Sequence, residues 1–293
     1  MSIFKGCGVA VITPMHEDGS VDFQKFEEIL EWQIAEGIDS IIVCGTTGEA
    51  STLDNEEHIE VIRFAVEKVN KRVPVIGGAG SNDTKHGADL CKRIEATGVD
   101  GLLLVTPYYN KCSQKGLIGH YTVCADAVKI PCILYSVQGR TGVNIEPETV
   151  LELSKHPNIV GIKEASGNIS QVVEIARLVP EGFDIYSGND DMVVPLMALG
   201  GSGYISVLAN VAPADSVAMT RKYFEGDLKG SLELQLKMKP LIDALFADVN
   251  PIPVKAAMFM MGKCELVYRL PLCTPSDDVY DAIKAEMQAY GII

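Results

Sequence analysis

One lysine, Lys163, closes a short apolar run at residues 159–162 and is followed by Glu164. A run rich in β-branched residues that stops on a charged pair is typical of a buried strand with a functional group at its carboxyl end. A buried lysine is costly unless it is paired or its pKa falls, and a lysine with a lowered pKa is an amine nucleophile that can form a Schiff base with a carbonyl. Taken alone, the segment favours an ordinary lysine that reaches water, so the nucleophile hypothesis depends on its neighbours.

A glycine-rich turn at residues 45–49 follows the strand-like run at residues 40–44. In this turn two glycines flank Thr46 and Thr47, so the turn can be tight and its backbone N–H groups can converge on an anion. The turn lacks the Lys-Ser/Thr ending of a phosphate-binding loop, which favours a carboxylate as the anion. A plain glycine-rich turn is the alternative that this segment alone leaves open.

Two tyrosine-containing segments and an arginine follow the next strand-like runs. Tyr108 and Tyr109 come shortly after the run at residues 101–105, Tyr135 ends the following run, and Arg140 comes soon after it. A tyrosine within hydrogen-bond reach of a threonine can relay protons to bulk water, and the guanidinium fork of an arginine suits a carboxylate. Each tyrosine singly is explained by packing in the core or at the rim. Their joint placement at successive strand ends favours a reactive site.

Other chemistries find no support in the residue spacing. None of the five histidines lies at metal-ligand spacing from another, and no Gly-x-Ser-x-Gly elbow is present. The eight cysteines contain no Cys-x-x-Cys pair. We therefore expect reduced thiols in a cytosolic protein rather than a zinc or redox site.

The composition is that of a globular protein with ample length for a large core, because 47% of its 293 residues are hydrophobic and 22% are charged. A formal net charge of -14 makes nucleic acid and anionic membranes poor partners, so an anionic substrate must be attracted by local positive groups. The N-terminal residues lack the apolar core of a signal peptide, and no apolar run is long enough to span a bilayer. We therefore expect a cytoplasmic protein.

Strand-like and helix-like segments alternate along most of the chain, and this alternation must position the groups described above. Eight strand candidates follow one another at separations of roughly 20 to 35 residues, the length of a βα unit. They lie at residues 8–12, 40–44, 73–77, 101–105, 131–135, 159–164, 183–187 and 203–206. The pattern predicts an α/β fold, a (β/α)8 TIM barrel with catalytic groups at the carboxyl ends of its strands. A doubly wound sheet is the alternative, but it often carries a Gly-x-Gly-x-x-Gly turn that is missing here.

The last part of the chain shows a helical pattern only. The helix candidates lie at residues 216–224, 228–245, 253–261 and 277–290. No flexible linker, repeat or low-complexity tract precedes them. We therefore predict a catalytic barrel over residues 1–212 and a C-terminal helical extension over residues 213–293 that packs on the barrel.

Taken together, these motifs resemble those of the dihydrodipicolinate synthase family. The resemblance runs in order over essentially the whole chain, in segments at residues 45–49, 108–110, 135, 139–142, 161–165, 187–190, 205–207 and 250–255. The wider superfamily of pyruvate-dependent class I aldolases, which includes N-acetylneuraminate lyase, shares the glycine-rich loop and the lysine. The arginine and the Asn-Pro-Ile-Pro-Val-Lys stretch point to the synthases themselves.

The resemblance implies a lyase that works through a Schiff base. Lys163 would attack the ketone of pyruvate to form an imine, and the derived enamine would add to the aldehyde of L-aspartate 4-semialdehyde. Cyclisation would release Lys163 and give 4-hydroxy-tetrahydrodipicolinate, on the route to lysine and diaminopimelate. Thr46, Tyr135 and Tyr109 match the family's proton-relay triad, with Tyr109 reaching in from a neighbouring subunit of a homodimer or homotetramer. The resemblance implies no metal and no organic cofactor, because the lysine supplies the electron sink.

The resemblance also assigns the substrate contacts. Thr47 and its loop would hold the carboxylate of pyruvate, and Arg140 would hold that of the semialdehyde. Gly188 and the carbonyl of Ile205 would line the same pocket. The chain departs from the family at residues 135–138, where Tyr-Ser-Val-Gln replaces the usual Tyr-Asn-Val-Pro. Loss of the proline frees the backbone, which predicts a looser or differently placed loop around Arg140.

A regulatory site is implied in the same way. In lysine-sensitive members of the family the effector lies between subunits, at positions that match Ala50, Ser51, Leu53, Asn55, His58, Asn82, His86 and Tyr108. His86 stands where a glutamate typically meets the positive charge of the effector, Asn55 replaces a histidine or a larger group, and Ala50 replaces a hydroxyl. We therefore expect inhibition by lysine to be weak or absent, unless another acid such as Glu49 or Glu56 substitutes.

Two other functions stay open. N-acetylneuraminate lyase would use Lys163 and Tyr135 on a sugar acid, and Arg140 argues against it. A non-catalytic barrel that senses pyruvate-like ligands is an alternative of a different class. The complete set of Lys163, Tyr135, Thr46 and Tyr109 argues against that alternative.

Overall fold

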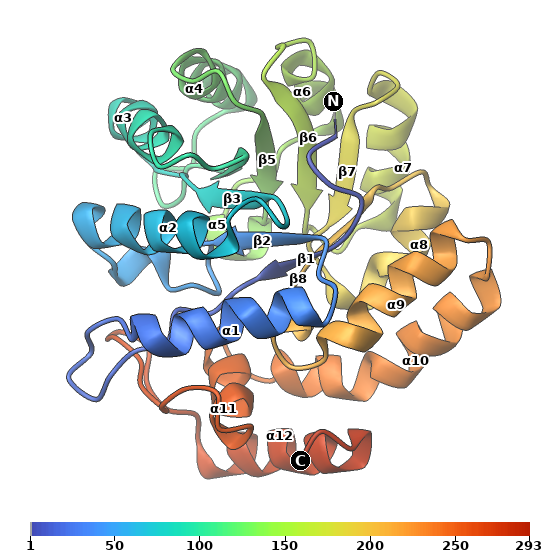
Figure 1. The fold of residues 1–293 in the computed structure, drawn as a ribbon. Coiled ribbons are helices and arrows are strands. Elements are labelled where there is room, and N and C mark those ends of the chain that lie inside the picture. Colours follow the sequence, from blue (N-terminus) through green and yellow to red (C-terminus); the bar gives the residue numbers. More distant parts are fainter. Residues whose placement is uncertain (1) are drawn as a thin grey trace.

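A closed barrel of eight parallel strands forms the centre of the molecule, as seen in the computed structural model, which describes residues 2–293 (Figure 1). Each strand pairs with its neighbours in sequence, and β8 closes the barrel against β1. The strands are β1 (Gly6–Ala10), β2 (Ser40–Val43), β3 (Val75–Gly78), β4 (Gly101–Val105), β5 (Cys132–Ser136), β6 (Ile159–Glu164), β7 (Asp184–Ser187) and β8 (Gly203–Ser206). The predicted (β/α)8 barrel is confirmed, and the expected strand ends lie within two residues of the observed ones.

Two apolar layers stabilise the barrel, one inside it and one between the strands and the helices. Successive side chains of a strand point to opposite faces, so Ile42 and Leu103 pack inside the barrel while Ile41 and Leu102 pack beneath the helices. All four side chains are almost fully buried. The same alternation sends the last two residues of β6 to opposite sides of the barrel wall.

Helices return the chain from the end of one strand to the start of the next. Their boundaries follow local capping signals: α2 begins after Asp54, whose carboxylate accepts the backbone N–H groups of Glu56 and Glu57, and ends at Asn70 in the left-handed conformation. The helices up to β8 are α1 (Phe23–Ala35), α2 (Asn55–Val69), α3 (Thr84–Glu95), α4 (Gln114–Asp126), α5 (Gln138–Thr141), α6 (Pro147–Leu153), α7 (Ile169–Leu178) and α8 (Val193–Ala198).

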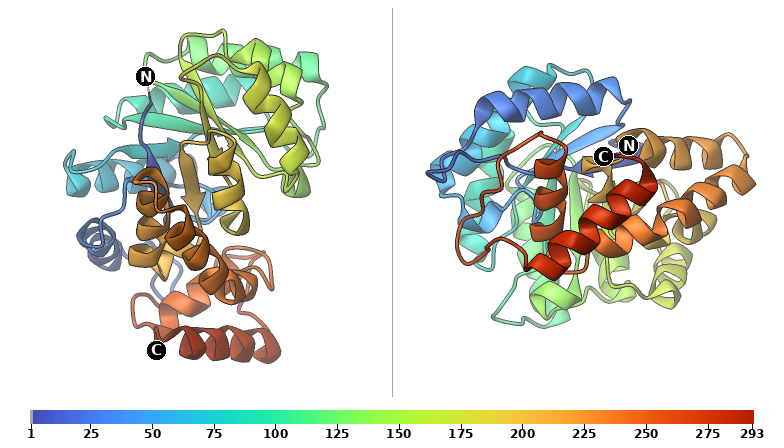
Figure 2. Two further views of the ribbon diagram at one scale, coloured as in Figure 1. Left: turned by 90° about the vertical axis from the view of Figure 1, so that its right-hand side faces the viewer. Right: turned by 90° about the horizontal axis from the view of Figure 1, so that it is seen from below.

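Four more helices follow the last strand. They are α9 (Pro213–Phe224), α10 (Leu228–Leu245), α11 (Ile252–Met260) and α12 (Asp277–Tyr290). Helix α9 contacts both β1 and α10, whereas α10, α11 and α12 contact one another and gather at one end of the molecule (Figure 2). The division of the chain at residue 213 remains our proposal. Within residues 2–293 no helix has the length and apolarity needed to cross a membrane.

Candidate active site

Lys163 lies near the carboxyl end of β6, where the barrel interior opens into a cavity. The register of β5 and β6 places Tyr135 directly beside Lys163, and Lys163 Nζ lies 4.4 Å from the centroid of the Tyr135 ring. Only 6% of Lys163 is exposed. The aromatic face attracts the lysine head-group and keeps it over the phenol ring. Strand pairing, rather than closeness in sequence, therefore brings the predicted nucleophile and the predicted acid–base group together.

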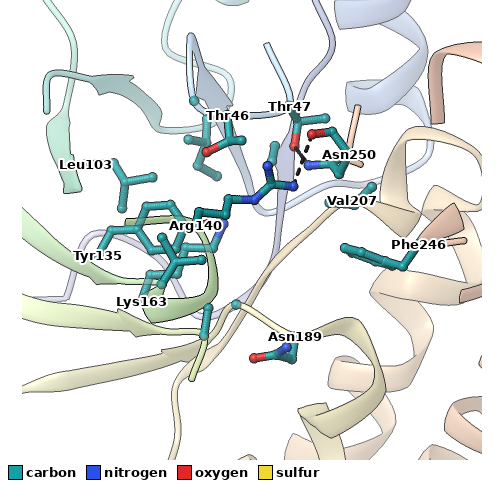
Figure 3. Close-up of a pocket in the computed structure, with 16 residues that line it drawn as sticks. Thr46, Thr47, Leu103, Tyr135, Arg140, Lys163, Asn189, Val207, Phe246 and Asn250 are labelled. Atoms are coloured by element: carbon teal, nitrogen blue, oxygen red, sulfur yellow. Dashed lines mark hydrogen bonds between the residues drawn. The ribbon is translucent and has the colours of Figure 1, made fainter. Parts of the chain in front are cut away.

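The cavity has a volume of about 90 Å³ and opens to solvent. It brings together six of the residues that the sequence singled out, and Figure 3 labels most of them. These six are Thr46, Thr47, Tyr135, Arg140, Lys163 and Gly188. Gly188 allows a close approach of the chain to the lysine, because a Cβ at this position would lie 3.0 Å from Lys163 Cε and 2.5 Å from Ala165 Cβ.

The turn at residues 45–49 is tight, as its glycines predicted. Gly48 N–H donates to the carbonyl of Gly45 over 3.1 Å, and a Cβ on Gly48 would lie 3.2 Å from the backbone of Cys44. Glu49 follows in the left-handed conformation with φ of 54°. Thr47 is 2% exposed, and its Oγ1 accepts a hydrogen bond from Asn250 Nδ2 over 3.0 Å. The turn therefore presents two hydroxyl side chains to the cavity from a backbone that the glycines make possible.

Arg140 extends across the cavity from the short helix α5. Its Nη2 donates to the backbone carbonyl of Asn250 over 3.0 Å (Figure 3). The helical turn is closed by a bond from Gly142 N–H to the carbonyl of Gln138 and is fixed by the hydroxyl pair of Thr106 and Thr141 at 2.9 Å. Residues 138–141 therefore form a hydrogen-bonded helical turn rather than a loose loop, and a placement of this turn that differs from the family's remains a prediction.

Two buried carboxylates lie near Lys163 but are used by the protein itself. Glu164 faces the helices, where it accepts a hydrogen bond from Gln171 Nε2 over 2.9 Å, and burial raises the pKa of its carboxyl. Asp190 accepts hydrogen bonds from the hydroxyl of Ser206 and the backbone N–H of Val207. Burial raises the pKa of Asp190, and these hydrogen bonds and the charge of Lys163 act in the opposite direction. Neither acid forms an ion pair with the lysine within the described residues.

Two of the predicted site residues do not reach this cavity in the protomer. Tyr109 is 90% exposed, has a left-handed backbone with φ of 74° and does not line the cavity. Ile205 is buried inside the barrel, and Val207, two residues later, lines the cavity instead. No hydrogen bond joins Thr46 to Tyr135 within residues 2–293. The protomer alone thus holds the predicted nucleophile, one tyrosine and two threonines, but not a connected proton relay.

Sequence reasoning missed the contribution of the C-terminal helices to the cavity. Phe246 and Asn250 line it from the segment between α10 and α11, and Asn189, Leu103 and Val207 are among its other lining residues. The only signal for Asn250 was its place at the start of the Asn-Pro-Ile-Pro-Val-Lys stretch. That stretch identified the family, but gave the asparagine no role.

The expected regulatory positions lie around the amino-terminal ends of α2 and α3. His86 Nδ1 lies 3.0 Å from Ser81 Oγ, and His86 Nε2 lies 3.2 Å from Asn55 Oδ1. His58 Nε2 lies 2.8 Å from the carbonyl of Gly78, and burial lowers the pKa of His58. The two positions that depart most from the family pattern, 55 and 86, are therefore hydrogen-bonded to each other.

Metal ligation and disulfides play no visible part in the described structure. Residues 2–293 contain no group of three His, Cys, Asp or Glu side chains that could hold a metal ion. All eight cysteines are free thiols, and six of them are buried.

A lysine and a tyrosine paired at the carboxyl ends of barrel strands define the class I aldolase type of site, in which an amine reacts with a carbonyl. The chain belongs to the Dihydrodipicolinate synthetase family, which it matches over residues 3–290. It is 54% identical over 291 residues to the 4-hydroxy-tetrahydrodipicolinate synthase of Acetivibrio thermocellus, covering 99% of each chain. It is 52% identical over 294 residues to that of Thermoanaerobacter sp. (strain X514), covering 100% of this chain and 99% of the relative.

Solved structures show the same likeness. The crystal structure of the chloride-inhibited dihydrodipicolinate synthase from Acinetobacter baumannii, complexed with pyruvate, superposes with a TM-score of 0.97 at 41% identity and covers 100% of both chains. The fold and the family are thereby established together.

Proposed function

We propose that this chain condenses pyruvate with L-aspartate 4-semialdehyde to 4-hydroxy-tetrahydrodipicolinate, with Lys163 as the Schiff-base nucleophile. The observation that carries the proposal is the position of Lys163, which is buried at the end of β6, faces the cavity and lies over the Tyr135 ring. Full-length relatives that are about half identical in sequence bear the name of this synthase.

The reaction follows from an amine that faces a carbonyl. Lys163 Nζ attacks C2 of pyruvate, and loss of water gives the imine. The protonated imine draws electrons from the neighbouring methyl group, so a methyl proton leaves and an enamine forms. The enamine carbon bonds to the aldehyde carbon of the second substrate. The α-amine of that substrate then attacks C2, closes the ring and displaces Lys163.

Proton movements need groups that both give and accept protons. The Tyr135 hydroxyl is the group of this kind beside Lys163, and Thr46 lines the same cavity. We propose that Tyr109 of a second subunit completes the relay, which makes a homodimer the minimum active unit and a tetramer its paired form. The support is that the Tyr109 side chain is 90% exposed in the protomer.

Two carboxylates must be held in a protein whose formal net charge is -14. We propose that Thr47 and the turn at residues 45–49 bind the carboxylate of pyruvate, and that Arg140 at the mouth binds that of the semialdehyde. Arg140 and, once it has formed, the protonated imine supply positive charge at the cavity itself. Since the imine nitrogen acts as the electron sink, the proposed reaction uses neither a metal nor an organic cofactor.

A coupled assay with pyruvate and L-aspartate 4-semialdehyde tests the function directly. The expected result is steady turnover, together with a covalent pyruvate adduct on borohydride reduction. Cleavage of N-acetylneuraminate to pyruvate and N-acetylmannosamine would favour the other pyruvate aldolase. Pyruvate binding without an adduct would favour the non-catalytic barrel and overturn the proposal.

A further inference from the structure

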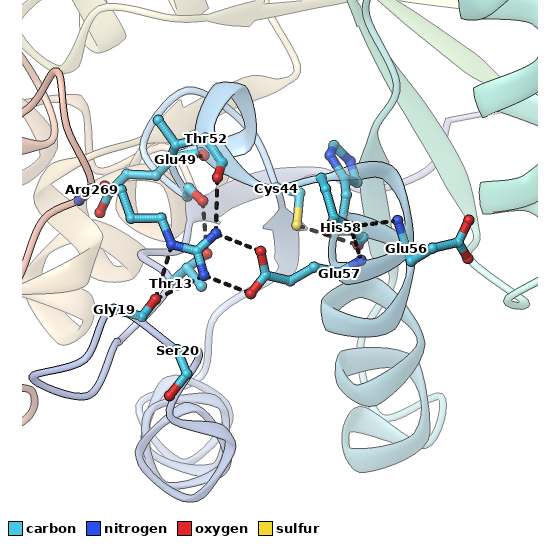
Figure 4. Close-up of polar contacts among 12 residues, drawn as sticks. Thr13, Gly19, Ser20, Cys44, Glu49, Thr52, Glu56, Glu57, His58 and Arg269 are labelled. Carbon is cyan, nitrogen blue, oxygen red and sulfur yellow. Dashed lines mark hydrogen bonds and ion pairs between the residues drawn. The ribbon is translucent and has the colours of Figure 1, made fainter.

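The C-terminal segment holds the glycine-rich turn at three points. Asn250 Nδ2 donates to Thr47 Oγ1 over 3.0 Å, and Lys255 forms an ion pair with Glu49 in which neither side chain is exposed. The backbone N–H of Arg269 donates to the second oxygen of Glu49 over 3.3 Å. Figure 4 shows Arg269 near Glu49, with its guanidinium bonded to Gly19, Thr52 and Glu57. Residues beyond the barrel therefore fix the shape of the turn.

The direction of the bond between Asn250 and Thr47 has a chemical consequence. A hydroxyl carries one proton and two lone pairs, so a threonine that accepts a hydrogen bond still has its proton to donate. Thr47 lines the cavity, and its hydroxyl donates no hydrogen bond within residues 2–293. The amide N–H of Asn250 thus orients Thr47 as a donor, which is the role that a bound carboxylate requires.

We infer that Asn250 is a positioning residue for the first substrate: its side-chain amide presents the Thr47 hydroxyl to the carboxylate of pyruvate. The inference deepens the proposed function and rests on its assignment of Thr47. Asn250 is 6% exposed, and its Oδ1 has no partner within the described residues, so its side chain makes a single hydrogen bond. The two carboxylate sites are separable, because Arg140 bonds to the backbone carbonyl of Asn250 and not to its side chain.

Two substitutions of Asn250 probe the direction of the bond. Asn250→Ala removes the donor and leaves the Arg140 contact to the backbone. Asn250→Asp keeps the size of the side chain but replaces the donor with a carboxylate oxygen. This oxygen accepts the hydrogen bond that the Thr47 hydroxyl would otherwise donate to pyruvate, and it adds a negative charge beside an anion site. The aspartate variant should therefore bind pyruvate more weakly than the alanine variant, although its shape is closer to that of asparagine.

The experiment measures how imine trapping at Lys163 depends on pyruvate concentration, together with both KM values and kcat in the coupled assay. We expect the half-saturating pyruvate concentration to rise about tenfold in Asn250→Ala and roughly a hundredfold in Asn250→Asp. The KM for the semialdehyde and kcat at saturation should stay within about twofold of wild type, as expected for a change in substrate binding alone. Thermal unfolding of each variant checks that the fold is retained.

A double-mutant cycle with Thr47→Val tests whether Asn250 acts through the threonine. The double variant should match Thr47→Val alone, because the amide has nothing left to orient. The inference would be overturned if the rise in half-saturating pyruvate concentration in the double variant equalled the product of the rises in the two single variants. It would also be overturned if the aspartate variant bound pyruvate as well as wild type.

Trapping separates this inference from the proposed function, since it needs no second substrate. A wild-type protein that forms no adduct at Lys163 refutes the function. A wild-type protein that forms the adduct, with unchanged half-saturation in Asn250→Ala, refutes the role of Asn250 alone.

Discussion

Two buried lysines lie close to the carboxyl ends of the barrel strands and have opposite surroundings. Lys163 is 6% exposed, faces the cavity and lies 4.4 Å from the centroid of the Tyr135 ring, without an ion pair in the described residues. Lys255, at the start of α11, is completely buried and is paired with Glu49, with its Nζ 5.2 Å from the Tyr268 ring centroid.

Both lysines share burial and an aromatic neighbour, so these two features cannot account for the reactivity that we propose for Lys163 alone. An ammonium held by a buried carboxylate has no lone pair for attack, and removing either partner leaves an uncompensated charge in the interior. The Lys163 side chain faces an open cavity, whereas the Lys255 ammonium faces the carboxylate of Glu49. Pairing therefore makes one lysine a structural cation, and its absence leaves the other available to a carbonyl.

The largest expected effect comes from removing the unpaired lysine. Lys163→Ala should lower kcat/KM by at least about 10⁴-fold while the protein stays folded, because the imine route is lost altogether. The coupled assay measures the loss, and circular dichroism checks the fold. Borohydride reduction with pyruvate, followed by peptide mass analysis, should give one modified peptide in the wild type, the one that contains Lys163. An adduct on Lys255 would break the comparison between the two lysines.

Removing the paired lysine should reduce stability rather than chemistry. Lys255→Met leaves the carboxylate of Glu49 buried with only the Arg269 N–H, and we expect a loss of about 3–5 kcal/mol in the free energy of unfolding. For a chain of this size the melting temperature should fall by roughly 6 to 10 °C. Differential scanning calorimetry measures the shift.

A double variant and a surface control make this test specific. Glu49→Gln combined with Lys255→Met should recover at least half of the loss, because no buried charge is left. Lys239→Met, which removes the exposed pair with Asp243, should leave the melting temperature nearly unchanged. A Lys255→Met variant as stable as wild type would show that the buried pair contributes little.

The surroundings of Lys163 extend beyond one protomer if Tyr109 completes the relay. Tyr109→Phe should lower kcat about 100-fold, the size of one acid–base contribution. Co-expression of Tyr109→Phe with Lys163→Ala should then restore up to about a quarter of the wild-type activity, because a mixed dimer has one complete site. Subunits with different affinity tags allow the mixed dimer to be purified and assayed.

The matched control uses the residue that strand pairing places beside Lys163 in the same chain. Co-expression of Tyr135→Phe with Lys163→Ala should restore no activity, since neither subunit then has a complete β5–β6 pair. Recovery in this control, or its absence with Tyr109→Phe, would contradict the proposed division of the site between subunits.

Local patterns predicted the barrel well, because strand burial and helix caps depend on residues close together in the sequence. The strand predicted at residues 159–164 is β6 with the same bounds, and alternation predicts which face each of its side chains takes. The contact between Thr47 and Asn250 joins positions 203 apart in sequence, and no local pattern encodes it. The family resemblance placed the carbonyl of Ile205 at the cavity, whereas the turn after β8 brings Val207 to the cavity wall.

The smallest expected effect concerns inhibition by free L-lysine, whose ammonium group can be compared with those of the two buried lysines. Lys255 is held by a carboxylate, and the ammonium group of free lysine would need a carboxylate in the same way. The expected effector site does not supply one. His86 Nε2 donates to Asn55 Oδ1 and so occupies an acceptor that an ammonium could use. The acids that could substitute are engaged elsewhere, since Glu49 pairs with Lys255 and Glu56 with Arg93.

We therefore expect L-lysine to inhibit weakly or not at all, and His86→Glu to lower the half-inhibitory concentration about tenfold by restoring a charge-assisted hydrogen bond. Titration of L-lysine into the coupled assay gives both values. His86→Gln is the matched control: its side chain has the length of glutamate without the charge, so it should leave inhibition as weak as in wild type. Equal gains in the two variants would show that size rather than charge limits binding. Half-inhibition of the wild type at a lysine concentration well below millimolar would mean that a carboxylate is not required at this site. The comparison of the two buried lysines would then not apply to the binding of free lysine.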